Sequence, residues 1–218
     1  MAENLQKEKK IRNWKSSVES SGCTVRSLKP ISEIRKSDGS LLFALLDTDV
    51  ISPEGNKLPH VVFIRGHACV IVPLLLNRDT GEERYLMVHQ RRIGNGHMSL
   101  EFPAGMLDEN SDASDVAIQE LMEETGLEAS RDELVPLTDK MLYSSAGACD
   151  EAVFYYGIVK EMGDDEFRSF IGRQGGCAHE HEFISTALMT REEAEKQATS
   201  LQVRLGFFLF DQKMKRNG

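Results

Sequence analysis

Three glutamates lie close together in this chain, at a spacing that could bind a metal ion. Glu120, Glu123 and Glu124 belong to the octet Glu-Leu-Met-Glu-Glu-Thr-Gly-Leu, residues 120–127. With 3.6 residues per helical turn, Glu120 and Glu124 share one helix face and Glu123 lies beside them. Repulsion at this spacing costs an isolated helix roughly 0.2–0.5 kcal/mol per pair. Either water or a hard cation must screen these charges, and carboxylate oxygens favour Mg²⁺ or Mn²⁺ over zinc.

A glycine turn before this helix supplies a further candidate ligand. Residues 101–105 read Glu-Phe-Pro-Ala-Gly, which predicts a short apolar strand that ends in a sharp turn. The turn frees the backbone carbonyl of Ala104, which could join the helix carboxylates around an ion. Strand, turn and acidic helix together indicate a metal site. A solvated acidic face is the alternative, because 35 of the 218 residues are acidic.

The elements that must position these groups alternate between strands and helices. Apolar runs and turn residues predict strands at 24–34, 41–47, 61–64, 68–76, 85–88, 100–102, 152–158 and 183–188. Helices are predicted at 113–125, at 191–197 after the cap Thr190, and at 201–213. This order is typical of a layered α/β fold. We expect a small N-terminal β-sheet subdomain over residues 1–58 and the main domain over residues 59–218.

Composition and charge exclude several classes of protein. The net charge of −9 argues against general binding to nucleic acid, which requires basic surface. The four cysteines include no Cys-x-x-Cys pair, a pattern that favours reduced thiols in the cytosol. Neither a membrane-spanning apolar run nor a signal-peptide core is present. We therefore expect a cytoplasmic protein that binds neither nucleic acid nor membrane.

Residues 105–127 resemble the Nudix box, whose pattern is Gly, five residues, Glu, seven residues and then Arg-Glu-U-x-Glu-Glu-x-Gly-U, with U a bulky aliphatic. Two positions depart from that pattern, because Ser111 replaces the first Glu and Gln119 replaces the Arg. Asp112 or Glu109 could stand in for the missing Glu, whereas Gln119 can hydrogen-bond but carries no charge. Counted from Gly105, the matching positions are Glu120, Leu121, Glu123, Glu124, Gly126 and Leu127.

A wider set of motifs resembles the ADP-sugar diphosphatases within Nudix, the plant-type enzymes most closely. His89-Gln-Arg-Arg92 followed by Leu100-Glu-Phe-Pro-Ala-Gly105 is similar to their Gln-x-Arg and Glu-U-Pro-Ala-Gly signature, and residues 62–66 and 145–151 are similar to theirs. The resemblance implies an α/β/α sandwich with a mixed sheet and a homodimer built by the N-terminal sheet. It also implies Mg²⁺-dependent hydrolysis of a nucleoside diphosphate-sugar, such as ADP-glucose or ADP-ribose, to nucleoside monophosphate and sugar 1-phosphate.

The same resemblance assigns a metal site and a phosphate contact. Glu120, Glu124 and the Ala104 carbonyl would bind Mg²⁺, with Mn²⁺ as a substitute. Glu123 would be a further ligand or would act through the other two. Arg92 would bind a substrate phosphate with its guanidinium group.

The remaining residues would contact the rest of the substrate or activate water. Glu180 matches the general base of the relatives, and Glu182 is its neighbouring alternative. Trp14 would stack on the nucleotide base, although it could instead anchor its own segment to the core. Glu151 would also contact the substrate.

Several interpretations stay open on the sequence alone. His179 and His181 could form a zinc or nickel site instead of a solvated loop. The substrate could be another diphosphate, such as UDP-glucose, NADH or a dinucleoside polyphosphate. The replacements at Ser111 and Gln119 also allow a nucleotide-binding domain that has lost turnover. The sequence specifies neither the preferred base and sugar nor the oligomeric state.

Overall fold

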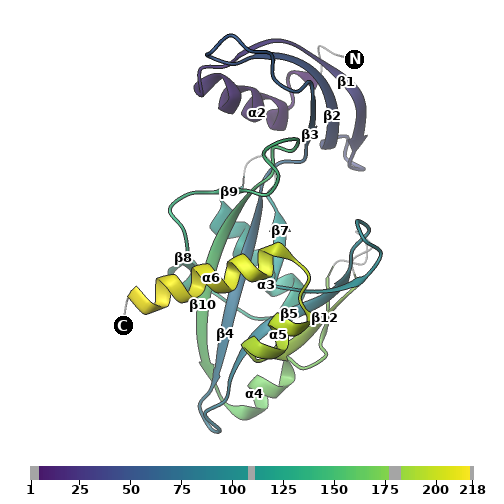
Figure 1. Ribbon diagram of the computed structural model, residues 1–218. Coiled ribbons are helices and arrows are strands. Elements are labelled where there is room, and N and C mark those ends of the chain that lie inside the picture. The colour runs from purple at the N-terminus through teal and green to yellow at the C-terminus, as the bar shows by residue number, and fades with distance from the viewer. Residues whose placement is uncertain (1–4, 108–110, 177–182, 217–218) are drawn as a thin grey trace. The chain divides into compact units, whose positions relative to one another are not determined.

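The chain forms two compact units in the computed structural model, which describes residues 5–107, 111–176 and 183–216 (Figure 1). The first unit contains the chain up to His67 together with residues Leu142–Val153. The second contains Ala68–Leu107, the chain from Ser111 to Met141, and the chain from Phe154 onward. The first unit is therefore built from two segments that are far apart in the sequence.

The first unit is a small antiparallel sheet with one helix. Its strands β1 (Thr24–Arg35), β2 (Leu41–Ile51) and β3 (Val61–Ile64) are ordered β1-β2-β3, and helix α2 spans Lys9–Ser20. The sequence analysis assigned residues 61–64 to the main domain, but their pairing with β2 places them here, so this unit extends past residue 58. Its core contains Leu5, Ile11, Leu28, Leu41, Ala44, Leu46 and Ile64.

The second unit is built on a large mixed sheet ordered β11-β12-β5-β4-β10-β8, with β6 and β7 at its sides, whereas β9, which pairs with the start of β10, belongs to the first unit. Its long strands are β4 (Ala68–Asn77), β5 (Glu83–Arg91) and β10 (Ala152–Met162), of which the first two residues of β10 belong to the first unit. The shorter strands are β6 (Met98–Glu101), β7 (Ala104–Met106), β8 (Val135–Pro136), β9 (Leu142–Tyr143), β11 (Gln174–Gly175) and β12 (Ile184–Met189).

Helices cover both faces of this sheet, because alternate strand residues face opposite sides. Leu86 of β5 packs in a core with Leu121 of α3 (Ala113–Thr125) and Phe167 of α4 (Asp164–Ser169). Its neighbour Tyr85 instead meets Phe207 of α6 (Leu201–Arg216), with ring centroids 4.8 Å apart. Helix α5 (Arg191–Gln197) begins at Thr190, which forms a capping box with Glu193. The predicted α/β/α arrangement is confirmed. Among the described residues, no helix is both long and apolar enough to cross a bilayer.

Candidate metal and substrate site

Helix α3 has well-defined ends and one buried face. The side chain of Asp112 caps the first turn by accepting the Ser114 N–H at 2.9 Å. Gly126 ends the helix in the left-handed conformation at φ 74°, and its N–H donates to the carbonyl of Met122. The buried face carries Val116, Ala117, Leu121, Glu124 and Thr125. Glu124 is thus the one acidic side chain on a face that is otherwise apolar or neutral.

Glu124 contacts the turn that the sequence analysis predicted. The N–H of Ala104 donates to its Oε2 at 3.1 Å, and the glutamate is only 3% exposed. Ala104 begins strand β7, which pairs with the start of β4 through Ala104 and Val70 and through Gly105 and Cys69. The helix carboxylate and the Pro-Ala-Gly turn therefore lie together, as the motif predicts.

Glu120 lies directly against Gly105. A Cβ atom added to Gly105 would lie 2.0 Å from the Oε1 atom of Glu120 and 2.1 Å from its Cδ. Real Cβ atoms do not approach other atoms so closely, so any side chain at this position would displace the carboxylate. Gly105 is required here for close approach rather than for a left-handed backbone.

The carboxylates of Glu120 and Glu124 both lie close enough to the buried thiol of Cys69 to affect it. Burial, assisted by the negative charges of Glu120 and Glu124, raises the pKa of the Cys69 thiol to about 12. The backbone N–H of Gly105 opposes this shift. Two carboxylates that act on one thiol beside the same turn form a compact acidic site.

These donors fit a hard cation. Mg²⁺ in proteins is commonly held by one or two carboxylates together with water and substrate oxygens, and Glu120 and Glu124 supply such a pair. The contacts of Glu124 with the Ala104 N–H and of Glu120 with Gly105 place both carboxylates at this turn. Within the described ranges, no group of three or more His, Cys, Asp or Glu side chains has the geometry of a complete metal site.

Glu123 projects from the exposed side of α3 and pairs with the residue that replaces the box arginine. The Nε2 atom of Gln119 donates to Glu123 Oε1 at 2.9 Å, one helical turn away. The backbone carbonyl of Glu123 also accepts the N–H of Gly176 at 3.1 Å. Gln119 therefore holds the carboxylate with a neutral hydrogen bond.

Arg92 lies directly after β5 and forms an ion pair with Glu101 at the end of β6. Its Nε contacts Oε1 at 3.1 Å and Oε2 at 3.2 Å, and its Nη2 contacts Oε2 at 2.7 Å. Burial would raise the pKa of Glu101, but hydrogen bonds from Arg92 and Ser99 outweigh it and lower that pKa overall. The sequence analysis did not identify Glu101 as a site residue, although it begins the Glu-Phe-Pro-Ala-Gly motif.

Two predicted substrate residues lie in the first unit. Trp14 is partly buried and packs against the core of that unit. Glu151 is 6% exposed, and its Oε2 accepts from Nη1 of Arg65 at 2.5 Å. The neighbouring carboxylate of Asp150 accepts the backbone N–H groups of Arg65, at 2.7 Å, and Gly66. The sequence analysis did not identify Arg65 as a partner, because 86 positions separate it from Glu151.

The other predicted residues are distributed as follows. Asp112, one candidate for the missing box glutamate, caps α3 and lies 3.5 Å from Arg131 in an exposed ion pair. Ser111 is exposed. Glu180 and Glu182, the two candidate bases, lie outside the described residues, as do His179, His181 and Glu109.

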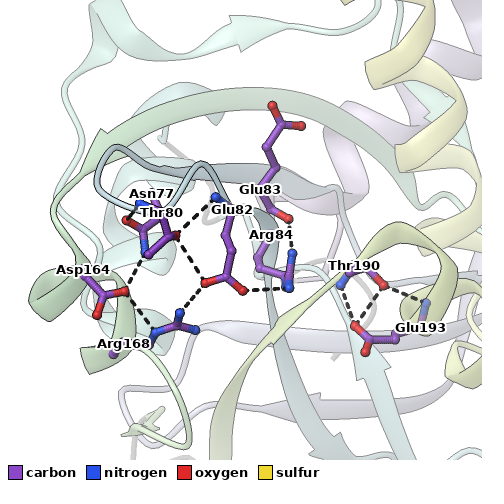
Figure 2. A network of polar contacts seen from close by, with 9 residues as sticks. All are labelled: Asn77, Thr80, Glu82, Glu83, Arg84, Asp164, Arg168, Thr190 and Glu193. Carbon is purple, nitrogen blue, oxygen red and sulfur yellow. Dashed lines mark hydrogen bonds and ion pairs between the residues drawn. The ribbon is translucent and has the colours of Figure 1, made fainter.

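A second charged cluster lies at the far end of β4, around the hairpin to β5 (Figure 2). Glu82 accepts from Arg84 at 2.9 Å and also pairs with Arg168. Asp164 accepts from Arg168 at 3.1 Å and from the side chain of Asn77 at 2.7 Å. Figure 2 shows these side chains converging on one another, so the charges in this cluster are neutralised within the protein.

Comparison with known proteins gives concordant results. A family described as NUDIX domain matches residues 66–205. Nudix hydrolase 14, chloroplastic, of Arabidopsis thaliana is 30% identical over 178 residues, which are 78% of this chain and 57% of that protein. ADP-ribose pyrophosphatase of Escherichia coli K12 is 32% identical over 144 residues, 64% of this chain and 62% of that protein. The chain thus spans less than two thirds of the length of both relatives.

Two further proteins extend the comparison. ADP-ribose pyrophosphatase of Bacillus subtilis is 31% identical over 155 residues, which are 71% of this chain and 75% of that protein. A solved crystal structure described as an ADP compounds hydrolase has a TM-score of 0.60 over 90% of this chain and 96% of its own, at 14% identity, and so shares the fold. The matched region contains the acidic helix, the Pro-Ala-Gly turn and Arg92, and the chain belongs to the Nudix family.

Proposed function

We propose that this protein is a Mg²⁺-dependent hydrolase of ADP-sugars, which it splits at the diphosphate into AMP and the sugar phosphate, a sugar 1-phosphate in the case of ADP-glucose. The observation that carries the proposal is the joint placement of two carboxylates on one turn, Glu120 against Gly105 and Glu124 on the Ala104 N–H. The names of the bacterial relatives support a substrate of the ADP-ribose class.

In this reaction a water oxygen bonds to one phosphorus while the bridging phosphorus–oxygen bond breaks. Negative charge builds on the phosphoryl oxygens, and catalysis depends on positioning and charge neutralisation. Glu120, Glu124 and the Ala104 carbonyl would hold Mg²⁺, which supplies positive charge to the diphosphate. Mn²⁺ would substitute for it.

The chain itself supplies phosphate recognition and proton transfer. Arg92 would bind a phosphate oxygen, while its contact with Glu101 fixes the plane of the guanidinium group. Glu180, or its neighbour Glu182, would accept the proton of the attacking water. Glu123, on the exposed side of α3, would be a further metal ligand or would act through Glu120 and Glu124.

The first unit would contribute substrate contacts and subunit association. Glu151 would contact the substrate together with its partner Arg65. Trp14 packs against the core of this unit but is only partly buried. The accessible part of its ring would stack on the base. We also propose that the N-terminal sheet builds a homodimer and that the protein acts in the cytoplasm. Light scattering coupled to gel filtration tests the dimer directly.

A substrate panel tests the proposed activity. The pure protein is incubated with Mg²⁺ and ADP-ribose, ADP-glucose, UDP-glucose, NADH or a dinucleoside polyphosphate, and phosphomonoester release is measured after adding phosphatase. We expect the ADP-sugars to react fastest, with activity lost in EDTA and restored by Mg²⁺. Turnover that persists without any divalent ion contradicts the metal assignment, and preference for another panel member contradicts the substrate class.

A second candidate is a Nudix domain that binds nucleotide without turnover. It is favoured by the neutral Gln119–Glu123 contact, which replaces an arginine of the box, and by the exposed Ser111 in place of a glutamate. No turnover on any panel member, combined with a ligand-induced rise in the unfolding temperature, supports this reading.

A further inference from the structure

Strand β11 approaches the last turn of α3 at a distance that only glycine permits. A Cβ atom added to Gly175 would lie 2.1 Å from the carbonyl oxygen of Glu124 and 2.7 Å from its carbonyl carbon. Both atoms belong to the backbone and cannot rotate away as a flexible side chain would. No left-handed φ is involved at Gly175, so close packing alone excludes a side chain there.

The residues on either side of Gly175 reinforce this contact. The N–H of Gly176 donates to the carbonyl of Glu123 at 3.1 Å. The guanidinium of Arg173 lies against Gly126, where an added Cβ would be 2.1 Å from its Cζ atom. Carbonyls in the last turn of a helix lack intrahelical partners, and a cation is favourable at that end. Three neighbouring residues therefore secure the turn that carries Glu123 and Glu124.

The other side of β11 is fixed to the sheet. Gln174 pairs with Ser185 and Gly175 with Ile184 of β12, and the N–H of Arg173 donates to Thr186 Oγ1 at 3.0 Å. Ile184 in turn pairs with Gln90 of β5, two residues before Arg92. A continuous set of backbone contacts thus connects the helix of Glu124 to the strand that ends beside Arg92.

We propose that Gly175 is a positioning residue for the metal site. Because it has no side chain, it sets the distance between the last turn of α3 and the β12–β5 part of the sheet. That distance fixes where the Glu124 carboxylate lies relative to Arg92. The inference rests on the proposed function for its effect on catalysis, but its effect on metal binding can be measured separately.

The test substitutes Gly175→Ala and measures Mn²⁺ binding by electron paramagnetic resonance or calorimetry in the absence of substrate. Substitutions that disturb groups supporting metal ligands typically weaken binding by about 10–100-fold, and we expect a rise of at least about tenfold in the Kd for Mn²⁺. If the protein hydrolyses ADP-sugars, kcat falls by a similar factor while KM changes little. Gly94→Ala is the matched control, since an added Cβ at this exposed glycine meets nothing within 4 Å.

A folded Gly175→Ala protein with unchanged Mn²⁺ affinity overturns the inference. Because this result needs no turnover, it is distinct from failure of the proposed hydrolase activity. Should Gly175→Ala not fold, Arg173→Ala loosens the same contact without adding an atom. The Mn²⁺ Kd of Arg173→Ala is then expected to rise about two- to fivefold, in keeping with the strength of a helix-terminus interaction. Unchanged binding in that variant also overturns the inference.

Discussion

Acidic residues from neighbouring segments lie near both ends of strand β4, in different settings. The strand has 10 residues and spans roughly 30 Å. At its far end, Glu82 is bonded to the guanidinium groups of Arg84 and Arg168 (Figure 2). Near its start, the nearly buried Glu124 accepts the backbone N–H of Ala104, from the turn that precedes its helix. The comparison indicates that the partner of an acidic group, more than its presence, separates structural clusters from candidate metal sites.

The largest expected effect comes from neutralising one carboxylate at each end. If Glu124 binds the metal as proposed, Glu124→Gln removes several kcal/mol of charge stabilisation, so kcat is expected to fall by about three orders of magnitude. Glu82→Gln should leave kcat within about twofold and lower the free energy of unfolding by up to about 1 kcal/mol, as for an exposed ion pair. Steady-state release of phosphomonoester, detected with added phosphatase, measures kcat, and urea unfolding measures the free energy of unfolding. Similar losses of kcat in the two variants would remove the functional distinction between the ends.

A smaller effect is expected from filling the space beneath Glu120. Gly105→Ala places a Cβ where the Glu120 carboxylate lies, so the carboxylate must move. We expect kcat/KM to fall by about 10–100-fold, and the concentration of Mg²⁺ that gives half-maximal rate to rise. Gly81, near the far end of β4, cannot serve as the control, because its φ of 74° would strain an alanine. Gly94→Ala is therefore the control again. Full activity at ordinary Mg²⁺ would show that the contact is not needed.

The pH dependence of stability tests the Arg92–Glu101 pair. Since Arg92 and Ser99 lower the pKa of Glu101 below its unfolded value, this residue stabilises the fold above about pH 4.3. That stability is lost as the pH falls through the lower, folded pKa. In Arg92→Ala the burial of Glu101 is opposed only by the hydrogen bond from Ser99, so the pKa of Glu101 rises and the loss of stability that this residue causes on acidification should shrink or disappear. Urea unfolding between pH 3 and 7, with Arg91→Ala for comparison, measures this shift, and superimposable acid limbs would contradict it.

The smallest expected effect concerns the neutral contact on the exposed side of α3. Gln119→Arg would give Glu123 a charged partner at helical i, i+4 spacing, worth about 0.3–0.5 kcal/mol. The unfolding temperature should rise by about 1–2 °C, and high salt should remove the gain. Calorimetry at two salt concentrations provides the measurement. A decrease at low salt would mean that the amide is better suited to this position.

Local signals predicted the elements that carry the candidate metal site. Helix α3 was expected at 113–125 and occupies those residues, because a glycine ends it at residue 126. Helix α5 likewise begins after Thr190, whose cap is visible in the sequence. The same applies to the Pro-Ala-Gly turn, since its residues and the helix carboxylates are close in the chain. Patterns within a few residues were therefore sufficient to predict these two helices and the turn.

Contacts between distant segments could not be predicted in this way. Strand β11 contains only Gln174 and Gly175, and it exists because β12 and the end of α3 lie on either side of it. The strand Val61–Ile64 was expected, but its pairing with β2 was not, because strand partners are chosen by tertiary packing. Helix α4 is too short for its apolar spacing to be recognised.

The two-segment construction of the first unit has a consequence for biosynthesis. Domains commonly fold in order as the chain emerges from the ribosome, N-terminal parts first. Here the N–H groups of Arg65 and Gly66 find their acceptor only in Asp150, and the side chain of Arg65 finds Glu151 beside it. The contacts of Arg65 and Gly66 at the end of this unit's sheet must therefore wait until about half of the second unit has been synthesised. The earliest part of the chain is, in this sense, among the last to be completed.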